Sequence, residues 1–84
     1  MWKVQRSANG ESVILALSGR IEADQLAELE RLFEAEGKPL VLDLEELELV
    51  DREAVRFLAH CRAEGIRLQR CPAYVHAWME REAG

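Results

Sequence analysis

The spacing of apolar residues changes repeatedly along the chain, and each spacing predicts a kind of element. Apolar and polar side chains alternate over residues 2–5, which is the period-two pattern of a strand with one buried face. This run is short, so we expect an edge strand. The pair Asn9-Gly10 then favours the positive φ angles of a tight hairpin turn. The uninterrupted apolar run at residues 13–17 predicts a partner strand that is buried on both faces.

Beyond this second strand the apolar spacing lengthens to that of a helix. Glu22 and Asp24 suit the N-terminus of the helix, where the helix dipole favours negative charge. Gly37 and Pro39 are expected to end it. Residues 40–44 then return to a short apolar run that predicts another strand. The apolar face of the helix consists of Leu26, Leu29, Leu32 and Phe33.

The second half of the chain repeats this alternation. The glutamate-rich segment at residues 45–49 is expected to be a loop. Asp51 predicts the start of a helix, because its carboxylate can accept a hydrogen bond from the amide of Glu53 or Ala54. Gly65 is expected to end that helix. The inward-facing side chains of the helix are Ala54, Val55, Leu58 and Cys61.

A short strand and a last helix complete the pattern. Apolar and polar residues alternate over residues 66–69, and Pro72 suits the first position of a helix whose apolar face carries Val75, Trp78 and Met79. The element order is therefore β-β-α-β-α-β-α. It predicts an α/β fold in which a small mixed sheet of about four strands packs with three helices, with an antiparallel hairpin joined to right-handed parallel crossovers. We expect one domain over residues 1–84.

Composition narrows the class of protein. About half of the 84 residues are apolar and about a third are charged, which is typical of globular domains. The net charge of −5 disfavours nucleic acid and anionic lipid as partners. The longest uncharged apolar run, at residues 13–17, is far shorter than the ~20 residues that cross a bilayer, and the N-terminus has no signal-type pattern. We therefore expect a cytoplasmic protein without membrane insertion.

The charge is unevenly distributed along the chain. Residues 22–48 contain ten acids and two bases, whereas residues 52–70 contain five arginines and two glutamates. The acidic stretch fits either an ordinary solvated face or an interface that orients a partner.

The sequence contains no pattern that predicts catalysis. Paired carboxylates such as Glu45 with Glu46 look equally exposed, whereas acid–base catalysis needs contrasting environments. A phosphate-binding glycine loop and a nucleophile elbow are both missing. The side chains with zinc-ligand atoms are spaced unlike any compact ligand pair: they are His60, Cys61, Cys71 and His76. We therefore expect no enzyme, no metal, no cofactor and two reduced thiols, with Cys61 in the core and His60 in solvent.

Several segments together resemble the STAS domain family, which includes bacterial anti-sigma factor antagonists and modules of sulfate transporters. The resemblance covers nearly the whole chain, and it implies an α/β fold and a role in protein binding, signal transduction and transcription regulation. The segments that carry it are Ser18-Gly19-Arg20-Ile21, Val41-Leu42-Asp43-Leu44 with Leu47, Val50-Asp51, Gly65-Ile66-Arg67-Leu68 and Pro72-Ala73.

The resemblance also identifies a departure from the family pattern. In switch members of the family, a serine follows the aspartate at the start of the second helix, and its phosphorylation breaks a complex. Here Arg52 occupies that acceptor position, within Asp51-Arg52-Glu53. Arginine cannot accept phosphate in this way, so we expect the usual switch to be absent. Glu53 could imitate a phosphate, but an acid in the first turn of a helix is ordinary dipole matching.

Three functions remain open at the level of sequence. The leading hypothesis is a protein-binding module whose partner, an anti-sigma kinase-like protein or a signalling assembly, contacts Asp51, Arg52, Glu53 and Arg56, while Val50 and Val55 hold that surface in place. The second is a small cytoplasmic STAS subunit of a membrane transporter, such as a lipid-trafficking ABC system, with the ATPase as partner. The third is a small-molecule or lipid binder that uses an apolar pocket near the last helix. A homodimer is compatible with each of them.

The last helix bears on the third hypothesis. Its aromatic and sulfur-containing side chains, Tyr74, Trp78 and Met79, could line a pocket, but a stripe at helical spacing more often belongs to a core. We expect Trp78 in the core and Tyr74 partly exposed. Chains of the resembled family often continue with another strand and helix after this point, so a free sheet edge or apolar patch is expected here.

Overall fold

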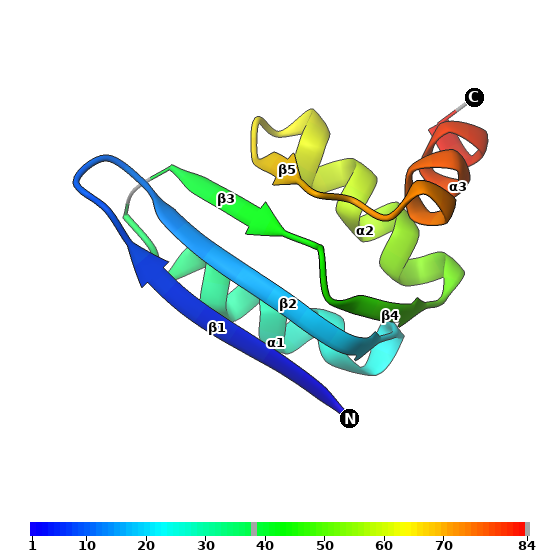
Figure 1. The fold of residues 1–84 in the computed structure, drawn as a ribbon, viewed down its shortest axis with the longest axis horizontal. Helices are drawn as coiled ribbons and strands as arrows, with labels where there is room; N and C mark the ends of the chain where they lie inside the picture. The colour runs from blue at the N-terminus through cyan, green and yellow to red at the C-terminus, as the bar shows by residue number, and fades with distance from the viewer. Residues whose placement is uncertain (38, 84) are drawn as a thin grey trace.

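The fold is a mixed five-stranded sheet with three helices, seen in a computed structural model that describes residues 1–37 and 39–83 (Figure 1). The strands are joined in the order β1-β2-β3-β5, and β4 pairs with the far half of β2. β1 and β2 are antiparallel, while the pairings of β2 with β3, β2 with β4 and β3 with β5 are parallel. The elements are β1 (Trp2–Ala8), β2 (Val13–Ile21), α1 (Ala23–Glu34), β3 (Leu40–Asp43), β4 (Leu47–Val50), α2 (Arg52–Ala63), β5 (Arg67–Gln69) and α3 (Ala73–Ala83).

The expected α/β class and mixed sheet are confirmed, with one additional strand. β4 lies where the sequence predicted a loop. It forms because β2 runs on to Ile21, past the end of β3, so that Gly19 and the residues after it need another parallel neighbour. The register of this pairing shifts between Gly19 and Arg20. β4 itself shows no period-two pattern, since only its terminal residues Leu47 and Val50 are buried.

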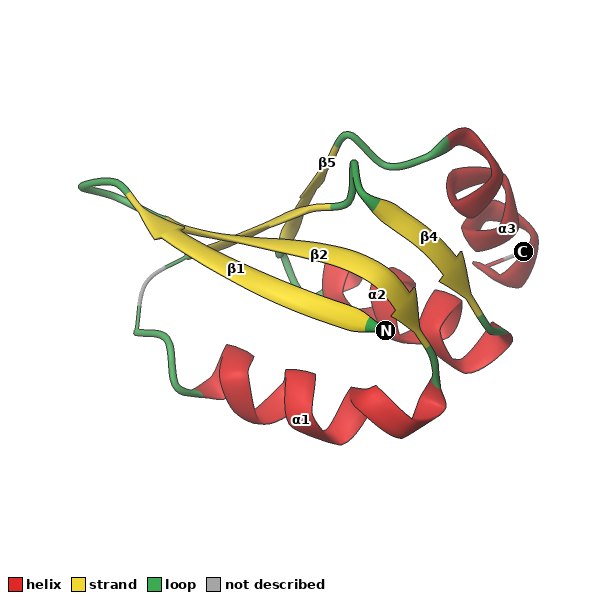
Figure 2. Cartoon of the chain, turned by 60° about the horizontal axis from the view of Figure 1, so that its bottom comes forward, coloured by secondary structure: helices red, strands yellow, loops and turns green. Residues whose placement is uncertain are grey.

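The central strand β2 is buried on one face only, so the expectation of two buried faces is wrong. Val13, Leu15 and Leu17 are buried, whereas Ile14 and Ala16 between them are only partly covered. α1 and α2 both lie on the same side of the sheet, below it in Figure 2. The apolar run in β2 therefore alternates in environment although it does not alternate in sequence.

The β1–β2 turn is closed by a side chain rather than by positive φ angles. The Asn9 Oδ1 atom accepts hydrogen bonds from the amides of Glu11 at 3.1 Å and Ser12 at 2.9 Å. Among the described glycines, positive φ occurs at Gly19 and Gly65, not at Gly10. The hairpin was thus expected correctly, but its mechanism was not: the Asn9 side-chain carbonyl supplements a backbone hydrogen bond from the Asn9 amide to the Ser12 carbonyl at 3.1 Å.

Helix α1 buries a narrower face than its sequence suggests. Leu29 is fully buried and Leu26 and Phe33 pack partly against the core, but Leu32 is 38% exposed. At 3.6 residues per turn, Leu26, Leu29 and Phe33 lie within about 60° of one another around the helix axis. Leu32 lies about 60° beyond Leu29, outside this sector. The assignment of Leu32 to the apolar face is therefore wrong.

Helices α2 and α3 follow their expected patterns closely. The four predicted inward residues of α2 are all buried, and the helix ends one residue before Glu64, followed by Gly65 with a φ of 97°. Pro72 precedes α3 and its carbonyl accepts the amides of Val75 and His76. Val75 and Met79 are in the core, whereas Trp78, which was expected there, is only partly buried against it.

Candidate protein-binding surface at the start of helix α2

Asp51 ties the beginnings of two helices together. Its Oδ1 atom accepts a hydrogen bond from the amide of Ala54 at 2.9 Å, which confirms the expected helix cap. Its Oδ2 atom accepts one from the amide of Ala23, the first residue of α1, at 3.0 Å. The starts of α1 and α2 are therefore held side by side by one carboxylate, and the surface around them is built on rigid elements.

Arg52 and Arg56 share a single carboxylate from the end of α3. Each guanidinium donates through its Nε atom to Glu82 Oε1, at 3.3 Å from Arg52 and 3.0 Å from Arg56. Hydrogen bonding from Arg56 is the main cause that lowers the pKa of Glu82. The two arginine side chains stay 62% and 51% exposed while that of Glu82 is 17% exposed. One carboxylate thus orients two exposed guanidinium groups.

Glu53 completes the group of residues that the sequence singled out. Its carboxylate lies 3.8 Å from the Arg56 guanidinium, one turn away, and is exposed. Arg52, Glu53 and Arg56 therefore form one continuous exposed surface, and beneath it Val50 and Val55 are buried as expected. The sequence did not reveal Glu82, because it lies 30 residues from Arg52 and only the packing of α3 against α2 brings it there.

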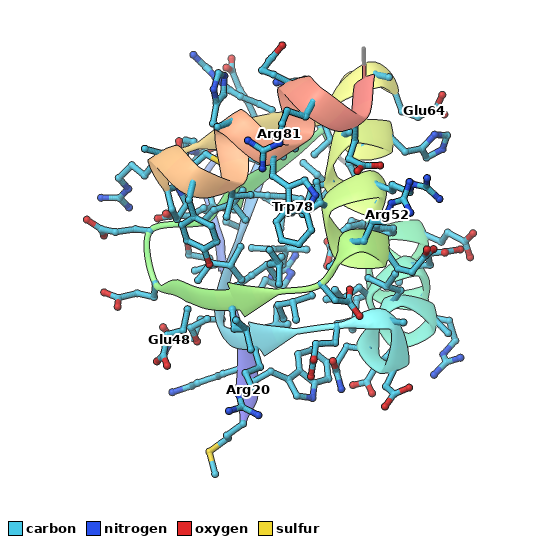
Figure 3. The ribbon with its side chains drawn as sticks, turned by 90° about the vertical axis from the view of Figure 1, so that its right-hand side faces the viewer. Arg20, Glu48, Arg52, Glu64, Trp78 and Arg81 are labelled. Atoms are coloured by element: carbon cyan, nitrogen blue, oxygen red, sulfur yellow. The ribbon has the colours of Figure 1, made fainter. Side chains whose placement is uncertain are left out.

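Exposed apolar side chains lie on β4 and on α3, the helix that packs against α2. Leu49 on β4 is 43% exposed, and Tyr74, as expected, is 46% exposed. The Tyr74 hydroxyl donates to the carbonyl oxygen of Glu48 at 2.9 Å, which fixes its ring over β4. Figure 3 shows Trp78 pointing from α3 towards β4, with Arg52 on the neighbouring α2. Tyrosine, tryptophan and arginine are the residues that contribute most to protein interfaces.

The thiols and imidazoles are dispersed. Burial, with a further contribution from the charge of Glu30, raises the pKa of the Cys61 thiol to about 11. Cys61 is in the core, as expected, whereas His60 and His76 are exposed. Within the part of the chain that the structure describes, no group of three or more histidine, cysteine, aspartate or glutamate side chains is arranged to hold a metal ion.

None of the helices formed by the described residues is long and apolar enough to span a membrane.

Comparison with known proteins agrees with this architecture. A sequence model of the family described as "Mlab, STAS domain" matches residues 4–81. No curated protein matches the chain. Because the family match covers almost the whole chain, the protein belongs to the STAS domain family, as the resemblance in its motifs indicated. Domains of this family commonly mediate protein–protein interactions and are generally non-catalytic.

Proposed function

We propose that this protein is a cytoplasmic, non-catalytic module that binds another protein through Arg52, Glu53 and Arg56 and is not regulated by phosphorylation at residue 52. The observation that carries the proposal is the pair of exposed guanidinium groups held by Glu82. Preoriented charge of this kind selects partners and speeds association more than it adds raw affinity. A partner with exposed carboxylates, such as an anti-sigma kinase-like or other signalling protein, fits this surface.

Asp51 has a positioning role in this proposal. Both of its carboxylate oxygens are occupied by backbone amides, so it holds the surface rather than contacting the partner. The patch of Leu49, Tyr74 and Trp78 supplies the apolar area that a charged surface alone lacks.

The test is a pull-down from extract of the native host with the wild type, Arg52→Asp and Arg67→Asp as baits. Arg67 is exposed on β5, so the control carries the same charge change away from α2. We expect a protein that the wild type and Arg67→Asp retain and Arg52→Asp loses. Equal retention by all three baits, or no retained protein at all, would contradict the proposal. Thermal unfolding of each bait checks that folding is unaffected.

A second candidate function is that of a constitutive subunit of a membrane transporter. Arginine at residue 52 favours it, because a surface that cannot be phosphorylated there suits permanent assembly. The family description that matches the chain, "Mlab, STAS domain", also does not name an anti-sigma antagonist. Co-purification of an ATPase in a fixed ratio that survives gel filtration would support this candidate, whereas a dissociable regulatory protein would support the first.

A further inference from the structure

A groove with an apolar floor lies between α1 and α2, away from the surface just described. Its volume is about 260 Å³. The floor is formed by Phe33, Phe57, Cys61 and Ile66. The two phenylalanine rings are stacked with their centroids 5.7 Å apart, and both remain partly exposed. Solvent therefore reaches an aromatic surface that neither helix covers completely.

The rim of this groove is acidic. Glu30 and Glu34 lie on α1, and Glu64 follows the end of α2; all three are exposed, and so is His60 of α2, which also lines the groove. No ion pair between described residues involves Glu30 or Glu64. The negative charges of Glu30 and Glu64 also act on Cys61 in the floor of the groove. Burial is the main cause that raises the pKa of this thiol, and the two carboxylates raise it further.

The size and charge of the groove limit what can occupy it. Its volume is below the roughly 300–1,000 Å³ of pockets that enclose a drug-sized ligand, so it suits a single large apolar side chain. An anionic lipid headgroup would be repelled by the carboxylates of the rim.

We propose that this groove binds a basic amphipathic segment of a partner protein, which places one large apolar side chain against Phe33 and Phe57 and its lysine or arginine side chains against Glu30 and Glu64. Apolar anchoring with flanking charge is the general mode by which amphipathic helices enter grooves. The site is separate from the surface at Arg52, because α2 (Arg52–Ala63) is about 18 Å long and Glu64 follows its far end. Figure 3 shows Arg52 and Glu64 near opposite ends of α2.

The test uses the full chain labelled with ¹⁵N and a synthetic 14-residue peptide with leucines on one helical face and lysines on the other. We expect saturable chemical-shift changes centred on the amides near Phe33, Phe57 and Glu64. The double variant Glu30→Gln/Glu64→Gln should bind about fivefold more weakly, because two exposed ion pairs are lost. A peptide with glutamate in place of lysine should not bind.

The matched control is Glu11→Gln/Glu48→Gln, which removes the same charge from exposed positions outside the groove. It should bind the lysine peptide with unchanged affinity. Equal weakening by the two double variants would mean that the peptide responds only to net charge, and the proposal would be wrong. Shift changes confined to the start of α2, or none at millimolar peptide, would overturn it too. A failure of the Arg52 pull-down leaves these readouts unaffected.

Discussion

At the scale of single residues, Gly19 shows how a backbone position restricts its side chain. Its φ is 83°, a conformation that side chains rarely adopt. A Cβ atom there would also clash with the carbonyl oxygen of Met1, which accepts a hydrogen bond from the amide of Arg20 at 3.1 Å. The β1–β2 hairpin and the register shift to β4 meet at this residue.

The substitution Gly19→Ala should therefore lower the free energy of unfolding, by about 1–3 kcal/mol from the backbone conformation alone. Urea denaturation would measure it. The control is Gly10→Ala, since Gly10 has open space around it and no positive φ. A loss at Gly10 as large as that at Gly19 would contradict the proposed cause.

Asp43 links stability to pH. It is one of the few charged groups in the interior, 8% exposed, and it accepts hydrogen bonds from the Arg70 guanidinium and from the amide of Glu45. The bond from Arg70 is the main cause that lowers the pKa of Asp43. Arg70 reaches it with a φ of 53°, in the left-handed region.

Because the folded pKa of Asp43 is below its unfolded value near 3.8, its ionised form stabilises the fold above that pH. The contribution is lost as the pH falls through the folded pKa. We expect Asp43→Asn to melt at a lower temperature than the wild type at neutral pH, and the difference to shrink below about pH 4. Melting curves of both proteins between pH 2 and 7 provide the measurement. Parallel curves, or the same behaviour in Glu48→Gln at an exposed position of β4, would count against this linkage.

At the scale of elements, two leucines one turn apart on α1 occupy different environments. Leu29 is fully buried and Leu32 is 38% exposed, although their sequence pattern is the same. Leu29→Ala should cost about 2–5 kcal/mol of unfolding free energy, as in other buried positions. Leu32→Ala should cost less than about 1 kcal/mol. Urea denaturation of both variants in one buffer would measure the two changes in the free energy of unfolding. Similar decreases for Leu29→Ala and Leu32→Ala would show that α1 packs on the sheet with a different face.

At the scale of the whole molecule, Cys61 reports on global unfolding. It lies in the core with a thiol pKa of about 11, so its reactive thiolate is scarce in the native protein. Cys71 is only partly buried, and burial raises its pKa as well.

In a Cys71→Ser variant, labelling of Cys61 with a thiol reagent should be slow and should accelerate with urea in parallel with global unfolding. In a Cys61→Ser variant, Cys71 should react faster under native conditions. The unfolded chains in 8 M urea provide the common reference for both rates. Rapid labelling of Cys61 in the native protein would mean that the reagent reaches its sulfur from the groove between α1 and α2 without global unfolding.

Helix α2 organises both proposed binding surfaces. Its first two turns carry Arg52 and Arg56, while Phe57, His60 and Cys61 line one wall of the acidic groove, which Glu64 borders just after the end of the helix. The inward face between them is fully buried against the sheet. The two proposed surfaces therefore use different residues of the same helix, with Arg56 and Phe57 adjacent where they meet.

Elements whose signals are local could be predicted from the amino-acid sequence. Helical periodicity, the Asp51 cap and Gly65 at the end of α2 depend on neighbouring residues, so they could be predicted with the α/β class and most of the strand order. The motif pattern likewise indicated the family. Among the site residues, Arg52, Glu53 and Arg56 lie within two turns of one helix, which is why spacing alone brought them together.

Features that depend on partners distant in the sequence became visible only in the folded protein. β4 forms because β2 extends beyond the end of β3 and pairs with it there. Leu32 is exposed because only a narrow face of α1 packs against the core. Glu82 joins the arginines, and Phe33 stacks on Phe57, because helices far apart in sequence pack together. The physical reason is the same in each case: burial and ion pairing act through space, and residues 24 or more positions apart leave no periodic trace in the sequence.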